Sequence, residues 1–278
     1  MSPLGAGVVG LPQRMRLREQ LVLHLAHEII SGRLKAGEPL PSEPELAREF
    51  GISKVVLRET IQELVSYGLM RVQHGKRTTV LEQSEWDVLA TPVQEAFRLA
   101  GSAAVLTKQL YEVRLLLEMS AVALAAEHSA LSHVSELDAH VDVMRTIARQ
   151  TRDVPAFLRS DRAFHDVIAR AAGNMVLRAM MRDLHNVLAA NWTSSRTTHA
   201  QLESLVEQHA GIAEAIRSRD CTAARAAMEA HLLWAKGVEI ARDDREARLP
   251  HDDTGRSDRP SIWLKSASTG RRSGARHP

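Results

Sequence analysis

Apolar residues recur every three to four positions over most of the chain, which is the spacing of amphipathic helices. The first such pattern begins near Met15, places Leu21, Leu25 and Ile29 on one face, and stops at Gly32. This spacing predicts that the chain opens with a helix after a short leader rich in Gly and Pro.

Two further helices are predicted, and each is opened by a serine. Ser42 with Glu45 three residues later forms a capping-box pattern, and Gly51 ends that short helix. Ser53 is expected to cap the next helix, which ends before Gly68. The short loop between them is typical of a helix-turn-helix.

Two short extended runs follow, over 69–73 and 78–81. The residues between them include Gly75, and a glycine between two such runs is a hairpin signal. The order helix, helix, turn, helix and hairpin is that of a winged helix-turn-helix.

Beyond Glu82 the spacing is helical only. Seven helices are predicted, over about 85–100, 106–128, 133–150, 154–172, 175–195, 199–218 and 222–242. Short connections between helices favour an antiparallel bundle. The predicted fold class is therefore mainly α, with an N-terminal winged helix-turn-helix followed by an all-helical antiparallel bundle of six to seven helices.

Composition narrows the picture. A length of 278 residues with 44% hydrophobic content is enough for two cores, and the net charge of +2 means that any basic face must be local. The single cysteine, Cys221, excludes an intramolecular disulfide and a cysteine-rich zinc site. No apolar run approaches the ~20 residues of a membrane span, and the first twelve residues do not resemble a signal peptide. We expect a cytoplasmic protein without a membrane segment.

The predicted DNA-reading surface is the start of the second helix of the motif together with the hairpin turn. Lysine and arginine suit phosphates and guanine acceptors, and a serine hydroxyl suits a phosphate. The candidate DNA-binding residues are Ser53, Lys54, Arg58, His74, Gly75, Lys76 and Arg77. A winged domain that binds protein, with a basic tip, is the alternative.

Residues 16–80 resemble the N-terminal domain of the GntR family of bacterial regulators. The resemblance rests on the stretch 30–43, Glu45-Leu46-Ala47, Gly51-Ile52-Ser53-Lys54, Arg58-Glu59, Leu64, Gly68-Leu69 and 78–80. It implies a homodimer that binds a palindromic double-stranded DNA operator. The sequence departs from the family pattern where Pro44 replaces a usual Arg, Lys54 replaces a common Arg, and Arg77 stands at a wing glycine.

Four residues of the helical region have side chains suited to a metal. Asp161 and His165, four residues apart, share one helix face, while His209 and His231 lie in apolar surroundings on the two last long helices. Three imidazoles and one carboxylate suit zinc, nickel or manganese. With 13 histidines in the chain, hydrogen-bonded core or surface histidines fit the spacing as well.

Residues 105–241 resemble the ligand-binding domain of the FadR branch of this family, known as the FCD domain. The matching pieces are Tyr111-Glu112-Val113-Arg114, Leu117-Glu118, Asp161, Phe164-His165, Gly173-Asn174, the His209 stretch with Ala215-Ile216, Asp220, Ala224 and His231-Leu232. The resemblance implies that the Asp161, His165, His209 and His231 quartet binds a divalent metal ion, with zinc the foremost candidate.

Arg114 shares its helix face with Leu110 and Leu117, and a buried arginine needs an anionic partner. An internal ion pair with Glu118 or another carboxylate is one interpretation. The resemblance implies instead that Arg114 binds the carboxylate of a small effector. Asn174 is expected to cap the following helix, and His185, Asn186 and Trp192 are candidates to line the ligand cavity.

Together these features predict a homodimeric transcription regulator, a repressor and not an enzyme, whose operator affinity responds to a small organic acid. Two alternatives are a metal-dependent hydrolase fused to a DNA-binding domain and a metal-free sensor of acyl ligands. The predicted organisation is a flexible leader over 1–13, the winged domain over 14–82, a connecting helix or linker over 83–104, the FCD-like domain over 105–242 and a disordered tail over 243–278.

Overall fold

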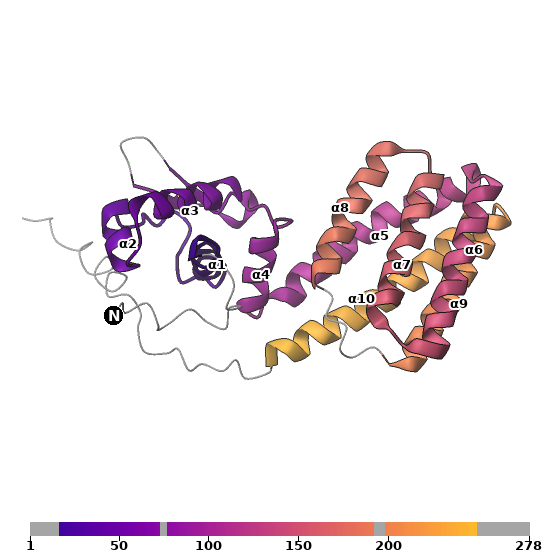
Figure 1. The fold of residues 1–278 in the computed structure, drawn as a ribbon. Helices are drawn as coiled ribbons and strands as arrows, with labels where there is room; N and C mark the ends of the chain where they lie inside the picture. The colour runs from indigo at the N-terminus through magenta and orange to yellow at the C-terminus, as the bar shows by residue number, and fades with distance from the viewer. Residues whose placement is uncertain (1–16, 73–76, 192–197, 249–278) are drawn as a thin grey trace, which may run out of the picture. The chain divides into compact units, whose positions relative to one another are not determined.

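The computed structural model describes residues 17–72, 77–191 and 198–248, and within them the chain is mostly helical (Figure 1). It forms two compact units: the chain up to Ser102 belongs to the first, and the second covers Ala103–Glu246. The first carries a helix-turn-helix with a small hairpin and the second is all-helical, so the predicted fold class is confirmed.

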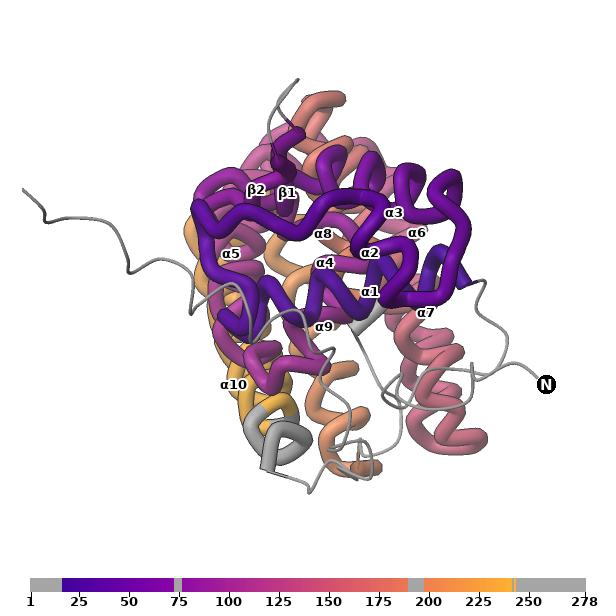
Figure 2. The backbone as a smooth tube through the Cα atoms, turned by 90° about the vertical axis from the view of Figure 1, so that its left-hand side faces the viewer, coloured from indigo at the N-terminus to yellow at the C-terminus, as the bar shows by residue number. Residues whose placement is uncertain are grey.

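The first unit is built around its first and third helices. Its elements are α1 (Leu17–Ile30), α2 (Glu43–Glu49), α3 (Lys54–Ser66), β1 (Met70–Arg71), β2 (Thr79–Val80), a 3-10 turn η1 (Gln83–Glu85) and α4 (Thr91–Leu99). Helix α3 packs against α1 and α2, and α4 packs against α1 (Figures 1 and 2). The core between them includes the buried side chains of Leu25, Leu57 and Leu64.

Both predicted serine caps are present. The carboxylate of Glu45 accepts hydrogen bonds from the backbone N–H and the hydroxyl of Ser42, at 2.9 and 2.7 Å. The hydroxyl of Ser53 accepts one from the N–H of Val56 at 3.2 Å. These caps fix where α2 and α3 begin, and so position the first turn of α3 at the protein surface.

The predicted hairpin is confirmed. Strands β1 and β2 are antiparallel, with Met70 opposite Val80. The segment before α2 joins the same small sheet, because the N–H of Leu40 donates to the carbonyl of Thr78 at 2.8 Å. The residues of and next to β2 are therefore hydrogen-bonded on two sides, to β1 and to the segment before α2.

The second unit is a helical bundle. Its elements are α5 (Ala103–His128), α6 (Leu131–Thr146), a π-helical turn η2 (Ile147–Thr151), α7 (Val154–Ala171), α8 (Met175–Asn191), α9 (His199–Arg217) and α10 (Cys221–Arg248). Helix α7 contacts α5, α6 and α8, and α5 also contacts α8 and α9. The rings of Phe157 and Phe164 on α7 are fully buried in this core.

The two largest differences from the predicted element boundaries are at the start of α4 and at the end of α10. The helix expected from about residue 85 begins at Thr91, because Pro92 suits a first helical turn and the preceding residues form η1 instead. The tail expected to be disordered from 243 is helical as far as Arg248, and the side chain of Asp243 is buried. A buried hydrogen bond, 2.5 Å from Oγ1 of Thr107 to Oδ2 of Asp243, helps to hold this extension of α10.

Within the described residues, no helix combines the length and the hydrophobicity that crossing a membrane requires. The first predicted helical residues, the wing turn and most of the predicted tail lie outside these residues.

Candidate metal and effector site

The four predicted metal ligands meet in the interior of the second unit. Asp161 and His165 come from α7, His209 from α9 and His231 from α10. One potential ligand atom of each lies within 4.8 Å of those of the other three. The three histidines are buried, whereas the side chain of Asp161 is 21% exposed and lines a cavity.

Each of these imidazoles is held by an acceptor at Nδ1. The three pairs are His165 with a carboxylate oxygen of Glu118, His209 with the carbonyl oxygen of Leu205 at 2.7 Å, and His231 with Oε1 of Gln208 at 3.0 Å. Carbonyl, amide and ionised carboxylate oxygens only accept, so Nδ1 carries the proton in every ring. In the neutral ring, Nε2 then keeps the lone pair with which histidine binds a metal.

The Nε2 atoms of His165 and His209 are buried and have no hydrogen-bond partner among the described residues. Nε2 of His209 lies 3.0 Å from Oδ1 of Asp161, close enough for an ion pair but without hydrogen-bond geometry. A buried polar atom without a partner costs about 1–3 kcal/mol. A divalent cation would satisfy both nitrogens and the carboxylate together, so the residues present fit such a cation.

Electrostatics favour the protonation state that binds a metal. Burial lowers the pKa of His165 and also the pKa of His231. Neutral imidazoles beside an ionised carboxylate are the form in which these groups coordinate a divalent ion.

A second group of possible ligands, Glu118, His165 and His185, overlaps the first. Here the polar atoms are already engaged, because Glu118 accepts hydrogen bonds from Nδ1 of His165, from Nε2 of His185 at 2.9 Å and from Nε of Arg114 at 2.6 Å. Burial acts to raise the pKa of Glu118, yet these basic neighbours lower it. Glu118 therefore acts as a buried anion that orients its partners.

The link between Glu118 and His185 is the part of the site that sequence reasoning missed. The two residues are 67 positions apart, so no local spacing connects them. The only available signal was the position of each on the apolar face of a helix.

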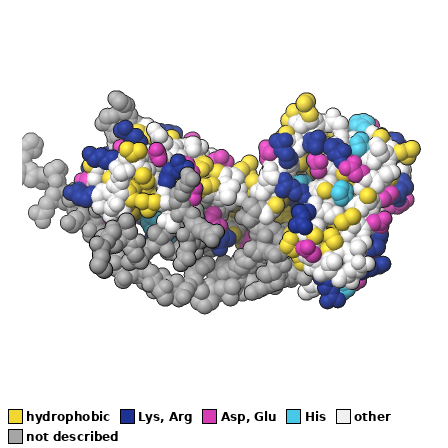
Figure 3. All heavy atoms as spheres, viewed as in Figure 1, with side chains coloured by type: hydrophobic (Ala, Val, Ile, Leu, Met, Phe, Trp, Pro, Cys, Tyr) yellow, Lys and Arg dark blue, Asp and Glu magenta, His cyan; other side chains and the backbone are white. Residues whose placement is uncertain are grey.

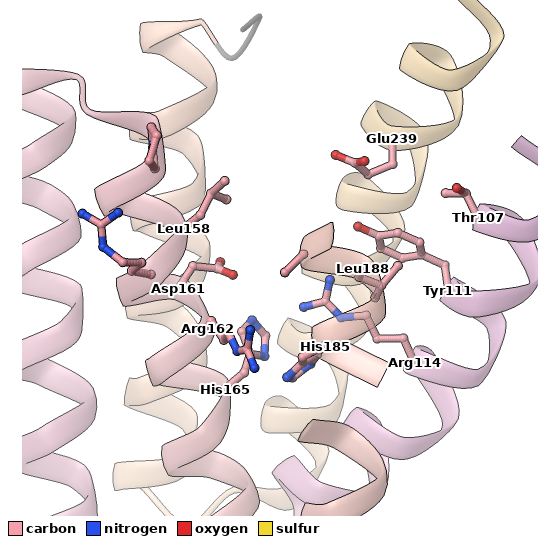
Figure 4. A pocket seen from close by; sticks show the side chains of 13 residues that line it. Thr107, Tyr111, Arg114, Leu158, Asp161, Arg162, His165, His185, Leu188 and Glu239 are labelled. Carbon is pink, nitrogen blue, oxygen red and sulfur yellow. The ribbon is translucent and has the colours of Figure 1, made fainter. Parts of the chain in front are cut away.

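A cavity of about 290 Å³ lies beside the quartet (Figure 4). Asp161, His165, His185 and Arg114 all contribute to its wall. Arg114 forms the ion pair with Glu118 that was one interpretation of the sequence. It also lines the cavity, as an effector-binding residue would. Its contact with an effector stays a prediction.

The remaining predictions around the cavity have separate outcomes. Asn174 caps α8, because its Oδ1 accepts hydrogen bonds from the N–H groups of Val176 and Leu177 at 3.0 and 3.1 Å. Asn186 does not line the cavity and instead accepts a hydrogen bond from Arg162. Trp192 lies outside the described residues.

The predicted DNA-reading residues of α3 lie at the surface of the first unit. Ser53 and Lys54 are exposed, and Arg58, with its side chain 69% exposed, has Nε 3.6 Å from Oε2 of Glu43. Figure 3 shows Lys and Arg side chains over α2 and α3 with acidic side chains among them, as the modest net charge predicts. Basic and acidic side chains are therefore mixed on this surface.

The wing residues are only partly described. Arg77 is exposed next to β2. His74, Gly75 and Lys76, also expected to contact DNA, lie outside the described residues.

Comparison with known proteins gives the family. The model of the gntR family of bacterial regulatory proteins matches residues 17–80, and the FCD domain model matches residues 109–233. The chain is 30% identical over 217 residues to the HTH-type transcriptional regulator LutR of Bacillus subtilis. The matched region covers 76% of this chain and 95% of LutR. The chain belongs to the GntR family and carries an FCD domain.

Two further comparisons are consistent with this assignment. The galactonate operon transcriptional repressor of Escherichia coli is 25% identical over 213 residues, covering 75% of this chain and 90% of that protein. A solved structure of Lar, described as controlling expression of the Listeria monocytogenes agr system, covers 83% of this chain and 99% of its own. Its TM-score of 0.52 and 18% identity show the shared fold alone. This GntR protein is accordingly a DNA-binding transcription regulator.

Proposed function

We propose that this regulator is a repressor that releases its operator when a small organic acid binds at a divalent-metal site. In this proposal Asp161, His165, His209 and His231 hold the cation, with zinc the first candidate and nickel or manganese the others. The observation that carries the proposal is the meeting of three Nδ1-anchored imidazoles with Asp161 at the wall of a cavity.

The chain's own residues supply orientation and charge. Glu118, Gln208 and the Leu205 carbonyl hold the three rings with Nε2 available. A bound cation would supply a Lewis-acidic site for an oxygen of the acid. Arg114, charged and at the cavity wall, is placed to bind the carboxylate.

For DNA binding we propose a homodimer that reads a palindromic operator. The start of α3, with Ser53, Lys54 and Arg58, would enter the major groove, and the wing residues 74–77 would contact the backbone or the minor groove. The acid changes operator affinity only if it binds the free and DNA-bound conformations with different affinities. Relatives named as repressors support the proposal that this chain represses transcription.

Two buried histidines offer a matched test of the metal site. His209→Ala removes a member of the quartet only, whereas His185→Ala removes a member of the Glu118 group only. We expect the wild-type chain, purified without chelator and equilibrated with zinc, to hold about one ion per chain. His209→Ala should lose that ion and His185→Ala should retain it, as measured by mass spectrometry of the metal content. The reverse pattern would contradict the assignment.

The same measurements separate the alternatives raised by the sequence. A wild-type chain that binds an acid without any metal would be a metal-free sensor. Turnover of esters or amides by the zinc-loaded chain, lost in His209→Ala, would favour the hydrolase. Under the proposal, metal-free His209→Ala still binds DNA but no longer responds to the acid.

A further inference from the structure

The cavity beside the metal quartet carries guanidinium groups from two helices. Arg114 comes from α5, and Arg159 and Arg162 come from α7. Arg114 is buried, whereas Arg159 and Arg162 are exposed. The cavity therefore has one arginine in its interior and two on its solvent side. Figure 4 shows Arg114 and Arg162 on the helices that form its walls.

The two arginines of α7 have no acidic partner. Arg162 donates a hydrogen bond to Asn186, which is neutral. Among the described residues, neither Arg159 nor Arg162 forms an ion pair with a carboxylate. Arg170, on the same helix but not at the cavity, pairs with Glu136 at 2.6 Å. Because a guanidinium stays charged, the cavity wall keeps two cations available for an anion from outside the chain.

The charge balance around the cavity also favours an anion. A divalent cation at the quartet and the three guanidiniums bring five positive charges. Asp161, Glu118 and Glu239 bring at most three negative charges, and protonation of any histidine would only add positive charge. The loaded site is therefore positive by at least two charges, which a doubly charged anion would balance.

The arginines of α7 lie close to the metal ligands. Arg162 follows Asp161 by one residue and precedes His165 by three, so it lies about 1.5 and 4.5 Å from them along the helix axis. Arg159 is three residues before Arg162 and shares its side of the helix. The cavity volume of about 290 Å³ is at the lower end of the range for small-molecule sites. A small acid bound at the cation can therefore also reach these arginines.

We propose that the effector is a small acid with two anionic groups. Its carboxylate binds Arg114 and the cation, and its second group, a carboxylate or a phosphate, binds Arg162 and Arg159. Arginine suits both groups because its planar guanidinium donates two parallel hydrogen bonds to either one. This inference rests on the proposed function and specifies its ligand. A monocarboxylic acid would leave the two arginines of α7 without an anion.

The test measures matched pairs of acids by isothermal titration calorimetry on the zinc-loaded full-length chain, freed of excess zinc. The pairs are succinate with succinamate, glutarate with glutaramate, and phosphoglycolate with glycolate. The second member of each pair keeps the first carboxylate and lacks the second charge. We expect the doubly charged member of at least one pair to bind at least about tenfold more tightly than its partner, since hydrogen bonds between charged groups are the stronger ones. The pair that shows this preference distinguishes a second carboxylate from a phosphate.

Variants at the solvent side locate the effect. The double variant Arg159→Gln, Arg162→Gln should reduce the preference within the best pair to less than about threefold, because partly exposed ion pairs each contribute modestly. The affinity for the singly charged partner should stay close to wild type. Glutamine at 162 keeps a donor for Asn186, and each single variant should lose part of the preference, which keeps the test valid if the double variant does not fold. Arg225→Gln, an exposed arginine of α10 outside the cavity, is the control for net charge.

Two failures are distinguishable. If the acids bind but no pair shows the preference, or the double variant keeps it as fully as Arg225→Gln does, the inference of a second anionic group is wrong while a sensor of acids remains. If none of these acids binds the zinc-loaded chain, the proposed function fails as well.

Discussion

Nδ1 of the buried His231 on α10 lies 3.0 Å from the side-chain oxygen of Gln208 on α9. The amide of Gln208 is itself oriented, because its nitrogen donates to the hydroxyl of Ser204 at 3.2 Å. This short network fixes the proton of His231 on Nδ1 and leaves Nε2 for the metal quartet. Residues that orient a ligand histidine in this way commonly tune metal affinity.

We therefore expect Gln208→Leu to lower zinc affinity by about 10–100-fold, measured by competition with a chromogenic chelator. Gln208→Glu keeps an acceptor at the same place and should stay close to the wild-type affinity. Glu207→Leu, an exposed neighbour on the same helix, is the control for a general effect on α9. Equal affinities for the leucine and glutamate variants at position 208 would show that the contact with His231 does not orient the ring.

Part of this site follows from local sequence. Asp161 and His165 share a helix face because they are four residues apart, and the helices that carry them and His209 were predicted from periodicity. Periodicity does not say which helix faces meet, and the convergence of the quartet was expected only through the family resemblance. The role of Glu118 as a shared partner of three basic groups depends on tertiary packing and has no local signature.

In the fold, too, features with a local sequence signal were predicted and features that depend on tertiary contacts were missed. Capping patterns at Ser42 and Ser53 are local and were predicted, as was the hairpin. The predicted start of α4, near residue 85, was wrong because it placed Pro92 in the interior of a helix. Proline suits the first turn of a helix, and α4 begins at Thr91. The extension of α10 to Arg248 was missed because the residues are polar, and their helix is supported by the long-range contact between Thr107 and Asp243.

Gly68 and Gly32 give a matched pair for backbone strain. Both have positive φ, +68° and +73°, but a Cβ at Gly68 would lie 1.9 Å from the backbone oxygen of Glu85, whereas at Gly32 nothing lies within 4 Å. Gly32→Ala should cost about 1–2 kcal/mol from the left-handed conformation alone. Gly68→Ala should lower the free energy of unfolding by clearly more, because the backbone after α3 must move. If urea denaturation gives equal losses of unfolding free energy for the two variants, η1 moves away from the new Cβ at no cost in free energy.

The ion pair between Glu28 and Arg33 predicts a pH dependence of stability. The two side chains make two hydrogen bonds, at 2.8 and 2.7 Å, next to the end of α1. Burial acts to raise the pKa of Glu28, but the hydrogen bonds and charge of Arg33 outweigh it, so the folded pKa lies below the ordinary value of 4.5. The pair therefore stabilises the fold above about pH 4.5, and this stability is lost as the pH falls through the folded pKa.

Glu28→Gln should accordingly lower the free energy of unfolding at pH 7 by about 0.5–1 kcal/mol, a small value because both side chains are partly exposed to solvent. The difference in free energy of unfolding between this variant and wild type should shrink as the pH is lowered from 5 to 3. Thermal unfolding at each pH measures it. Glu59→Gln, which changes an exposed carboxylate on α3, is the control. A difference that persists at pH 3 would assign the effect to packing rather than to charge.

The last prediction concerns the contact between Arg58 and Glu43, which sets a carboxylate 3.6 Å from a proposed DNA-binding guanidinium. Glu43 competes with DNA for Arg58 and repels phosphates, so Glu43→Gln should raise operator affinity. Arg58→Ala should cost about 1–3 kcal/mol on the cognate operator if Arg58 reads a base. Lys54→Ala should weaken binding to all duplexes and reduce the salt slope by about 1, as loss of one phosphate contact does.

These changes are measured by fluorescence anisotropy over a series of salt concentrations, on an operator selected from random DNA. Lys108→Ala, an exposed lysine on α5, is the control for net charge. If Lys54→Ala and Lys108→Ala change the affinity and the salt slope equally, the first turn of α3 makes no specific phosphate contact. If Glu43→Gln weakens binding as much as Arg58→Ala, the carboxylate positions the arginine on DNA instead of competing for it.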